Sequence, residues 1–161
     1  MTRFLVGIAV VVFSTYCGRF MAKKYRTRKQ FFQQAASFNA RFLEELAYAR
    51  RPFEEFCAKT QLYGEFHEMI QMENLRRNER KTTQDDFSQY GFLSADEKTF
   101  FKDYFSAIGR GDSQSQKAYF SRAGNCLEAW KNQAIEECSK RFDMYTKLGF
   151  LSGLAALIFL V

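Results

Sequence analysis

The chain has 161 residues, of which 47% are apolar and 17% are aromatic, and most of the aromatic residues are Phe. This length and composition correspond to one small domain with enough apolar side chains to form a core. A single Pro and nine Gly exclude the collagenous, Pro-rich and turn-rich all-β classes. We therefore expect an all-α protein.

The formal net charge is +6, but its distribution along the chain argues against a nucleic-acid-binding domain. Eight of the 24 basic residues precede Glu44, which is the first acidic residue. The rest of the chain therefore contains 16 basic and 18 acidic residues and is nearly neutral. Binding of nucleic acid requires positive charge spread over a face that neutralises several phosphates together. We therefore expect no nucleic-acid partner.

The basic cluster directly follows an apolar run at residues 4–17, which extends to residue 22. Such a run is typical of a signal peptide, a lipoprotein signal or an uncleaved transmembrane helix. No small-residue cleavage site precedes the charges, and residues 14–17 lack the small residue that a lipobox needs before its Cys. Because Lys and Arg stay on the cytoplasmic side, the basic flank favours an uncleaved transmembrane helix at residues 1–22. The flanking basic residues are Arg19, Lys23, Lys24 and Arg26, and binding of anionic lipids is a second role for them.

A second apolar run, at residues 148–161, follows Lys140, Arg141 and Lys147. A helix of this length covers only about 21 Å of a hydrocarbon core of roughly 30 Å, so interfacial side chains must supply the rest. A buried core helix is the alternative for so short a run. Because both runs have basic flanks on their inner side, we predict transmembrane helices at 1–22 and 148–161 and a cytoplasmic helical-bundle domain at 23–147.

Helical periodicity fills the segment between the two runs. Apolar residues at steps of three and four predict that the first helix continues to about Arg51. Pro52 suits a first helical turn and should begin a short helix that ends at Lys59. A third helix is expected from about Leu62 to Asn78. Its apolar face would comprise Phe66, Met69, Ile70 and Met72.

Polar residues separate this helix from the next elements. The charged stretch at residues 76–83 predicts an exposed loop, after which Thr83 and Asp86 mark a helix start. Ser94 and Glu97 form the pattern of a capping box before a helix over residues 98–105.

The segment 108–113 reads Ile-Gly-Arg-Gly-Asp-Ser and predicts a sharp turn. Gly109 or Gly111 suits a left-handed helix C-cap, and Ser113 with Gln116 forms the pattern of a second capping box. A long helix should begin there and lead into the final apolar run. The first and last helices should pair antiparallel and carry about four shorter ones. The expected fold is an all-α antiparallel helical bundle with N- and C-terminal transmembrane helices.

Residue types that support catalysis or metal binding form no recognisable pattern. The four Cys include no C-x-x-C pair, and His67, the only His, has no partner at metal-ligand spacing. We therefore expect no metal, no cofactor and no enzymatic activity, and we interpret the Cys side chains as small apolar core groups. A nucleophile pair of Cys57 and His67 is the catalytic alternative.

Four ordered motifs resemble the stage III sporulation protein AB family of endospore-forming bacteria over nearly the whole chain. Ile108 and Phe53 stand where the family usually has Leu. The matching residues are Gly18, Ala22, Tyr25 and Arg28, then Glu45, Tyr48 and Pro52, then Gly109, Asp112 and Gln116, and finally Lys140, Met144, Tyr145, Leu148, Gly149 and Gly153.

This resemblance implies a mother-cell membrane component of a sporulation channel assembly that works beside a secretion-type ATPase. It also implies a soluble part similar to the cytoplasmic helical domain of the type II secretion inner-membrane platform protein. The expected role is a non-enzymatic platform or adaptor between mother cell and forespore. The expected partners are membrane lipids and other channel components, with a homo-oligomer left open.

Two other functions stay open at this stage. One is a stand-alone membrane-anchored signalling or lipid-binding protein, and the other is a membrane enzyme that uses Cys57 or His67. The turn from Gly109 to Gln116 would meet a cytoplasmic partner or simply cap the long helix, and Glu45 would pair with a basic residue of a neighbouring helix or face solvent.

Overall fold

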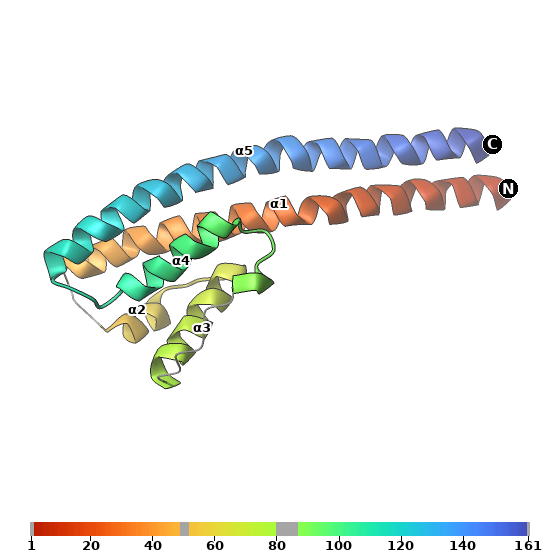
Figure 1. Cartoon of the computed structure of the whole chain (residues 1–161). Helices are drawn as coiled ribbons and strands as arrows, with labels where there is room; N and C mark the ends of the chain where they lie inside the picture. Colours follow the sequence, from red (N-terminus) through yellow and green to blue (C-terminus); the bar gives the residue numbers. More distant parts are fainter. Residues whose placement is uncertain (1, 49–51, 80–86, 161) are drawn as a thin grey trace. The chain divides into compact units, whose positions relative to one another are not determined.

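The computed structural model describes residues 2–48, 52–79 and 87–160, and these contain helices and no strand. This confirms the all-α prediction, and the described residues contain three short α-helices and one 3-10 helix between two long α-helices (Figure 1). In chain order the elements are α1 (Thr2–Tyr48), α2 (Phe53–Lys59), α3 (Gly64–Glu79), the 3-10 helix η1 (Phe87–Gln89), α4 (Ala95–Ala107) and α5 (Ser113–Leu160).

The chain divides into two compact units, and each long helix contributes to both. Unit 1 consists of residues 1–29 and 133–161, and unit 2 consists of residues 30–132. The first part of α1 and the last part of α5 therefore belong to unit 1. The rest of both helices belongs to unit 2, together with α2, α3 and α4.

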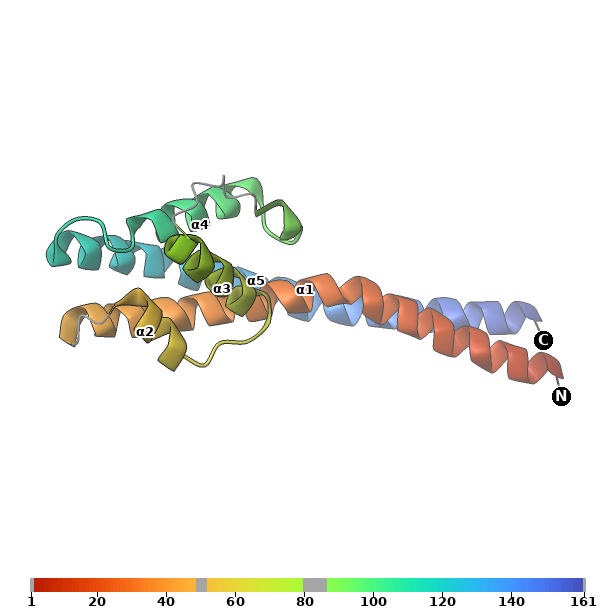
Figure 2. The same cartoon turned by 90° about the horizontal axis from the view of Figure 1, so that it is seen from below.

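In unit 1 the two helical segments lie side by side and run in opposite directions, as Figure 1 and Figure 2 both show. The Ser14 hydroxyl donates to the Gly149 carbonyl oxygen at 2.8 Å and lies 2.7 Å from the Ser152 hydroxyl. Further along α1, the Tyr25 hydroxyl accepts from Arg141 Nη1 at 3.1 Å. The later residue on α1 therefore pairs with the earlier residue on α5, which confirms the predicted antiparallel pairing.

Glycines set the close approach of the two backbones in unit 1. A Cβ atom at Gly18 would lie 2.6 Å from the Tyr145 carbonyl oxygen, and one at Gly153 would lie 2.8 Å from the Val11 Cα atom. Both obstacles are backbone atoms, which cannot turn aside as a flexible side chain can. Small residues therefore let these helices pack backbone against backbone.

The two apolar runs that were predicted as membrane spans lie in unit 1. Over the described residues, none of the helices combines the length and the apolar character that crossing a bilayer requires. The transmembrane helices predicted at 1–22 and 148–161 stay predictions, because part of each apolar run lies outside the described side chains. The side chains of residues 1–8, 10, 157 and 159–161 lie outside the described part of these runs.

Unit 2 has a core of Phe side chains. Phe42 of α1 packs edge-to-face on Phe120 of α5, with ring centroids 4.9 Å apart, and Phe31 meets Phe101 of α4 in the same way at 5.2 Å. Such pairs are worth about 0.5–1.5 kcal/mol beyond the area they bury. The buried Phe residues come from every α-helix and are Phe31, Phe32, Phe38, Phe42, Phe56, Phe66, Phe101, Phe105 and Phe120.

Several helix ends and faces differ from the predictions. Residues 76–79 belong to α3 rather than to a loop, because Arg76 and Arg77 pair with Glu73 on the preceding turn. Met72 is 42% exposed, so its predicted place on the apolar face is wrong. Residue 51, the expected end of the first helix, and the helix start at Thr83 and Asp86 lie outside the described residues.

The capping box before α4 is confirmed. The Glu97 backbone N–H donates to the Ser94 hydroxyl at 3.2 Å, and the Ser94 backbone N–H donates to Glu97 Oε2 at 2.8 Å. The helix that follows is longer than predicted, because it starts directly after Ser94 and continues to Ala107.

Candidate functional site

Several basic residues of unit 1 have partners within the protein. Arg28 Nε lies 3.5 Å from Glu137 Oε2, and Lys140 Nζ lies 2.6 Å from Glu136 Oε1. The Arg141 guanidinium carbon lies 5.3 Å from the centre of the Tyr25 ring. Arg28 and Arg141 therefore contribute to the pairing of α1 with α5, whereas the Lys140–Glu136 pair lies within α5.

Other basic residues of unit 1 line an open hollow on its surface. Arg19, Lys23 and Arg26 come from α1, and none of the ion pairs among the described residues involves them. Lys24 is exposed but does not line the hollow. The hollow has a volume of about 550 Å³ and is completed by Tyr16, Phe20 and Phe142. The predicted basic flank thus divides into residues that line the hollow and residues that do not.

Gly149 and Gly153 act in the contact between the helices of unit 1. A Cβ atom at Gly149 would lie 2.9 Å from the Ser14 carbonyl oxygen, so this position resembles Gly153 in tolerating no side chain. The structure therefore gives these two motif residues a packing role.

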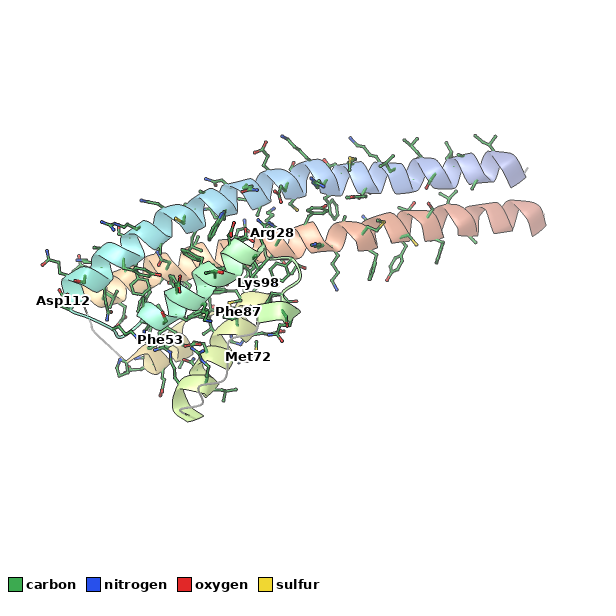
Figure 3. The ribbon with its side chains drawn as sticks, viewed as in Figure 1. Arg28, Phe53, Met72, Phe87, Lys98 and Asp112 are labelled. Atoms are coloured by element: carbon green, nitrogen blue, oxygen red, sulfur yellow. The ribbon has the colours of Figure 1, made fainter. Side chains whose placement is uncertain are left out.

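The turn before α5 has the predicted glycine conformations. Gly109 and Gly111 have φ angles of 80° and 84°, a region that L side chains rarely adopt, and this confirms the expectation of left-handed glycine. Three residues after Gly109, Asp112 lies at the start of α5 (Figure 3). Both glycines are exposed and belong to unit 2.

The predicted capping box of Ser113 and Gln116 is wrong. Asp112 caps α5 instead, because its Oδ2 accepts from the backbone N–H groups of Gln114 at 3.2 Å and Ser115 at 3.3 Å. Hydrogen bonds from Ser115 lower the pKa of the Asp112 carboxyl group, and the bond from the Ser115 side chain has a larger effect than the bond from its backbone. Gln116 Nε2 donates to the Arg110 carbonyl oxygen at 3.1 Å. The polar atoms of this motif therefore stabilise the turn itself.

The motif near the end of α1 lies in unit 2. Glu45 is half-buried, and Tyr48 is the last residue of α1 and 90% exposed. Pro52 precedes α2, and its carbonyl oxygen accepts from the Phe56 N–H at 3.1 Å. Among the described hydrogen bonds and ion pairs, none joins Tyr48 or Pro52 to the turn before α5.

A polar network that the sequence analysis missed links α2, α3 and α4. Arg77 Nε lies 2.9 Å from Oε1 of the buried Glu73, and its two terminal nitrogens donate to the Phe105 and Ile108 carbonyl oxygens. The guanidinium carbon lies 4.8 Å from the centre of the Phe53 ring, near the start of α2 (Figure 3). Arg77 therefore caps the C-terminal end of α4, where carbonyl groups have no helical partner.

A second missed group lies in the core of unit 2. Asn39 of α1 is 2% exposed, its Oδ1 accepts from the Tyr104 hydroxyl, and its Nδ2 donates to the Phe120 carbonyl oxygen, each at 3.0 Å. A Cβ atom at Gly124 would lie 2.9 Å from Asn39 Nδ2, so the amide occupies the space that glycine leaves. The signal for this group was a lone Asn within the Phe-rich stripe of α1.

The Cys and His side chains form no catalytic arrangement among the described residues. Burial raises the pKa of the Cys57 thiol to about 11, which leaves it protonated at neutral pH. No described contact joins Cys57 to His67, and no group of three or more His, Cys, Asp or Glu is placed to hold a metal ion. Cys17 and Cys126 are exposed, so the interpretation of all four Cys as core residues is wrong for these two.

Comparison with known proteins identifies the family. Neither a curated protein nor a solved structure gives a significant match. A family model described as stage III sporulation protein AB matches residues 3–161. Because this match covers nearly every residue, including the four motifs, the chain belongs to the stage III sporulation protein AB family.

Proposed function

We propose that the protein is a non-enzymatic platform component of a secretion-like sporulation channel complex between mother cell and forespore. The observation that carries this proposal is the family match over residues 3–161, which assigns a sporulation role. In the proposal, unit 1 attaches the chain to the mother-cell membrane and unit 2 binds cytoplasmic components, including a secretion-type ATPase.

The way in which unit 2 uses its polar groups supports a binding role. Buried Asn39 joins α1 to α4 and α5, and buried Glu73 pairs with Arg77, which in turn binds the end of α4. Burial keeps the Cys57 thiol protonated. These groups hold a rigid body in shape rather than activate a substrate. A rigid helical body is suited to present a surface to another protein.

The outer face of α3 is the surface of unit 2 that we propose for a protein partner. Met72 and Leu75 are three residues apart on this helix and therefore share a face, and Leu75 is 60% exposed. Figure 3 marks Met72 on α3. Large apolar side chains at a solvent-facing helix surface are typical of contacts with another protein.

A crosslinking pull-down from membranes of cells entering sporulation tests this function. The full chain, carrying an affinity tag, should recover other channel components and a secretion-type ATPase. Leu75→Arg should reduce recovery of the ATPase, because it places a charge in the centre of the proposed contact. Asn125→Arg is the matched control, because Asn125 is an exposed residue of unit 2 on α5.

The outcomes of the pull-down test the platform role and the proposed contact on α3 separately. Failure of the unmodified chain to recover any channel or ATPase component would contradict the platform role. Normal recovery with Leu75→Arg would place the contact on another surface of unit 2. Equal loss with Leu75→Arg and Asn125→Arg would assign the effect to charge rather than to the apolar face of α3.

A further inference from the structure

The hollow on unit 1 combines positive charge with aromatic walls. Arg19, Lys23 and Arg26 lie at steps of four and three along α1, so they share one face of the helix. Tyr16 and Phe20 come from the same face, and Phe142 comes from α5. Three cations and three aromatic rings thus surround a volume of about 550 Å³.

No acidic residue balances these cations within the described part of unit 1. Glu136 and Glu137 of α5 pair with Lys140 and Arg28, and Asp143 does not line the hollow. The segment of α1 in unit 1 contains no acidic residue, because the first in the sequence is Glu44. The hollow therefore presents uncompensated positive charge, which suits an anionic ligand.

An apolar groove adjoins the hollow on the side towards the start of α1. It has a volume of about 370 Å³, and it shares two lining residues, Tyr16 and Arg19, with the basic hollow. Its other lining residues are Val11, Val12, Thr15 and Phe150. From Val12 to Arg26 the two cavities follow about 21 Å of helix at 1.5 Å per residue.

We propose that these two adjoining cavities bind one anionic phospholipid. The phosphate of its headgroup would interact with Arg19, Lys23 and Arg26, and part of an acyl chain would lie in the groove between Val12 and Phe150. A free phosphate would fill only the basic part, whereas an amphiphile matches both the charge and the apolar extension. This inference rests on the membrane location in the proposed function.

A competition experiment with the full chain in dodecyl maltoside micelles tests the proposal. The probe is a fluorescent phosphatidylglycerol, whose binding is followed by anisotropy. Unlabelled phosphatidylglycerol should displace it, whereas phosphatidylcholine, inorganic phosphate and glycerol 3-phosphate should not. Displacement by inorganic phosphate or glycerol 3-phosphate at matched concentration would overturn the lipid assignment in favour of a free-phosphate site.

Charge variants separate the site from general attraction. Replacing Arg19, Lys23 and Arg26 by Gln should weaken phosphatidylglycerol binding about a hundredfold, since each cation contributes about fivefold. The control removes three other charges of unit 1, with Gln at Lys24, Lys29 and Lys147, and should weaken binding less than fivefold. Equal losses in the two triple variants would overturn the proposal, because binding would then follow net charge.

Two further measurements keep the test independent of folding and of the platform role. Arg19 and Arg26 replaced by Lys keep the charge and should retain most of the binding, so a loss there would contradict a site based on phosphate charge. Phe150→Asp should weaken phosphatidylglycerol binding without changing the fluorescence of Trp130 in unit 2. The pull-down of channel components is measured separately, so its failure leaves the lipid result interpretable.

Discussion

The hydrogen bond between Asn39 and Tyr104 allows a quantitative test of the core of unit 2. Asn39→Leu removes the bond to the Phe120 carbonyl oxygen and leaves the Tyr104 hydroxyl, which is 1% exposed, without its acceptor. A lost neutral hydrogen bond costs about 1 kcal/mol and an unpartnered buried hydroxyl a further 1–3 kcal/mol, which added Leu burial partly offsets. We expect the free energy of unfolding to fall by about 2 kcal/mol.

Tyr104→Phe and the double variant complete a double-mutant cycle with Asn39→Leu. Tyr104→Phe should cost about 1.5 kcal/mol, because it leaves Asn39 Oδ1 without a donor in the core. Combining it with Asn39→Leu should cost no more than about 2 kcal/mol, because both members of the hydrogen bond are then apolar. The predicted coupling is therefore about 1.5 kcal/mol.

Urea denaturation of the full chain in micelles, followed by Trp130 fluorescence, measures these values. Trp130 is the only Trp, and its ring centroid lies 4.8 Å from that of Phe100, so its emission reports on unit 2. The exposed control Asn125→Leu should change stability by less than about 0.5 kcal/mol. Additive losses of about 3.5 kcal/mol in the double variant would refute the proposed coupling between the two side chains.

Three further predictions concern the turn, the pairing of unit 1 and the buried thiol. Gly109→Ala should destabilise the protein by about 1–2 kcal/mol in the same urea assay, because L residues are strained at a φ of 80°. The control Gly91→Ala should have almost no effect on stability, because a Cβ atom added there has no atom within 4 Å. Gly153→Leu should separate the paired helices of unit 1, so spin labels on them should report a longer and broader distance distribution; an unchanged distribution would refute the close backbone contact. Cys57 should react with iodoacetamide far more slowly than the exposed Cys126. The rate at Cys57 should rise about tenfold per pH unit up to the pKa of the thiol near 11. Equal rates for the two Cys residues at neutral pH would contradict the burial of Cys57.

Local patterns predicted much of the fold because they involve residues close in sequence. Ser94 and Glu97 are three residues apart, and the positive φ angles of Gly109 and Gly111 follow from glycine in a short turn. The stripe through Phe31, Ala35, Phe38 and Phe42 repeats with the helical period, and all four side chains are buried. These features depend on backbone geometry that the sequence determines nearby.

Other features depend on contacts between distant residues or on a choice between similar neighbours. Asn39 and Tyr104 are 65 positions apart, and no short pattern joins them. The cap of α5 was assigned to Ser113 rather than Asp112 because both residue types are favoured N-caps, and only the structure shows whose oxygen accepts. Cys126 is exposed although Cys is among the residue types that are most often buried. The sequence around a single Cys does not show whether that position is an exception.

The candidate site was predictable only as a group of charges. The sequence identified Arg19, Lys23, Lys24 and Arg26 as one cluster because they lie close together before the first acidic residue. It did not distinguish Lys24 from the others, because that distinction depends on which helix face borders α5 and Phe142. The pairing of Arg28 with Glu137 likewise requires the register of two helices that are far apart in the sequence.

The proposed cytoplasmic side of unit 2 is tested most directly by labelling its exposed native thiol. Cys17→Ala leaves Cys126, in unit 2, as the only exposed Cys among the described residues. A membrane-impermeant maleimide is applied to intact and permeabilised cells that produce the full chain, with a reporter bearing an external Cys as the control. We predict that Cys126 reacts only after permeabilisation, while the reporter reacts both before and after it. Reaction of Cys126 in intact cells at the rate of the reporter would contradict it.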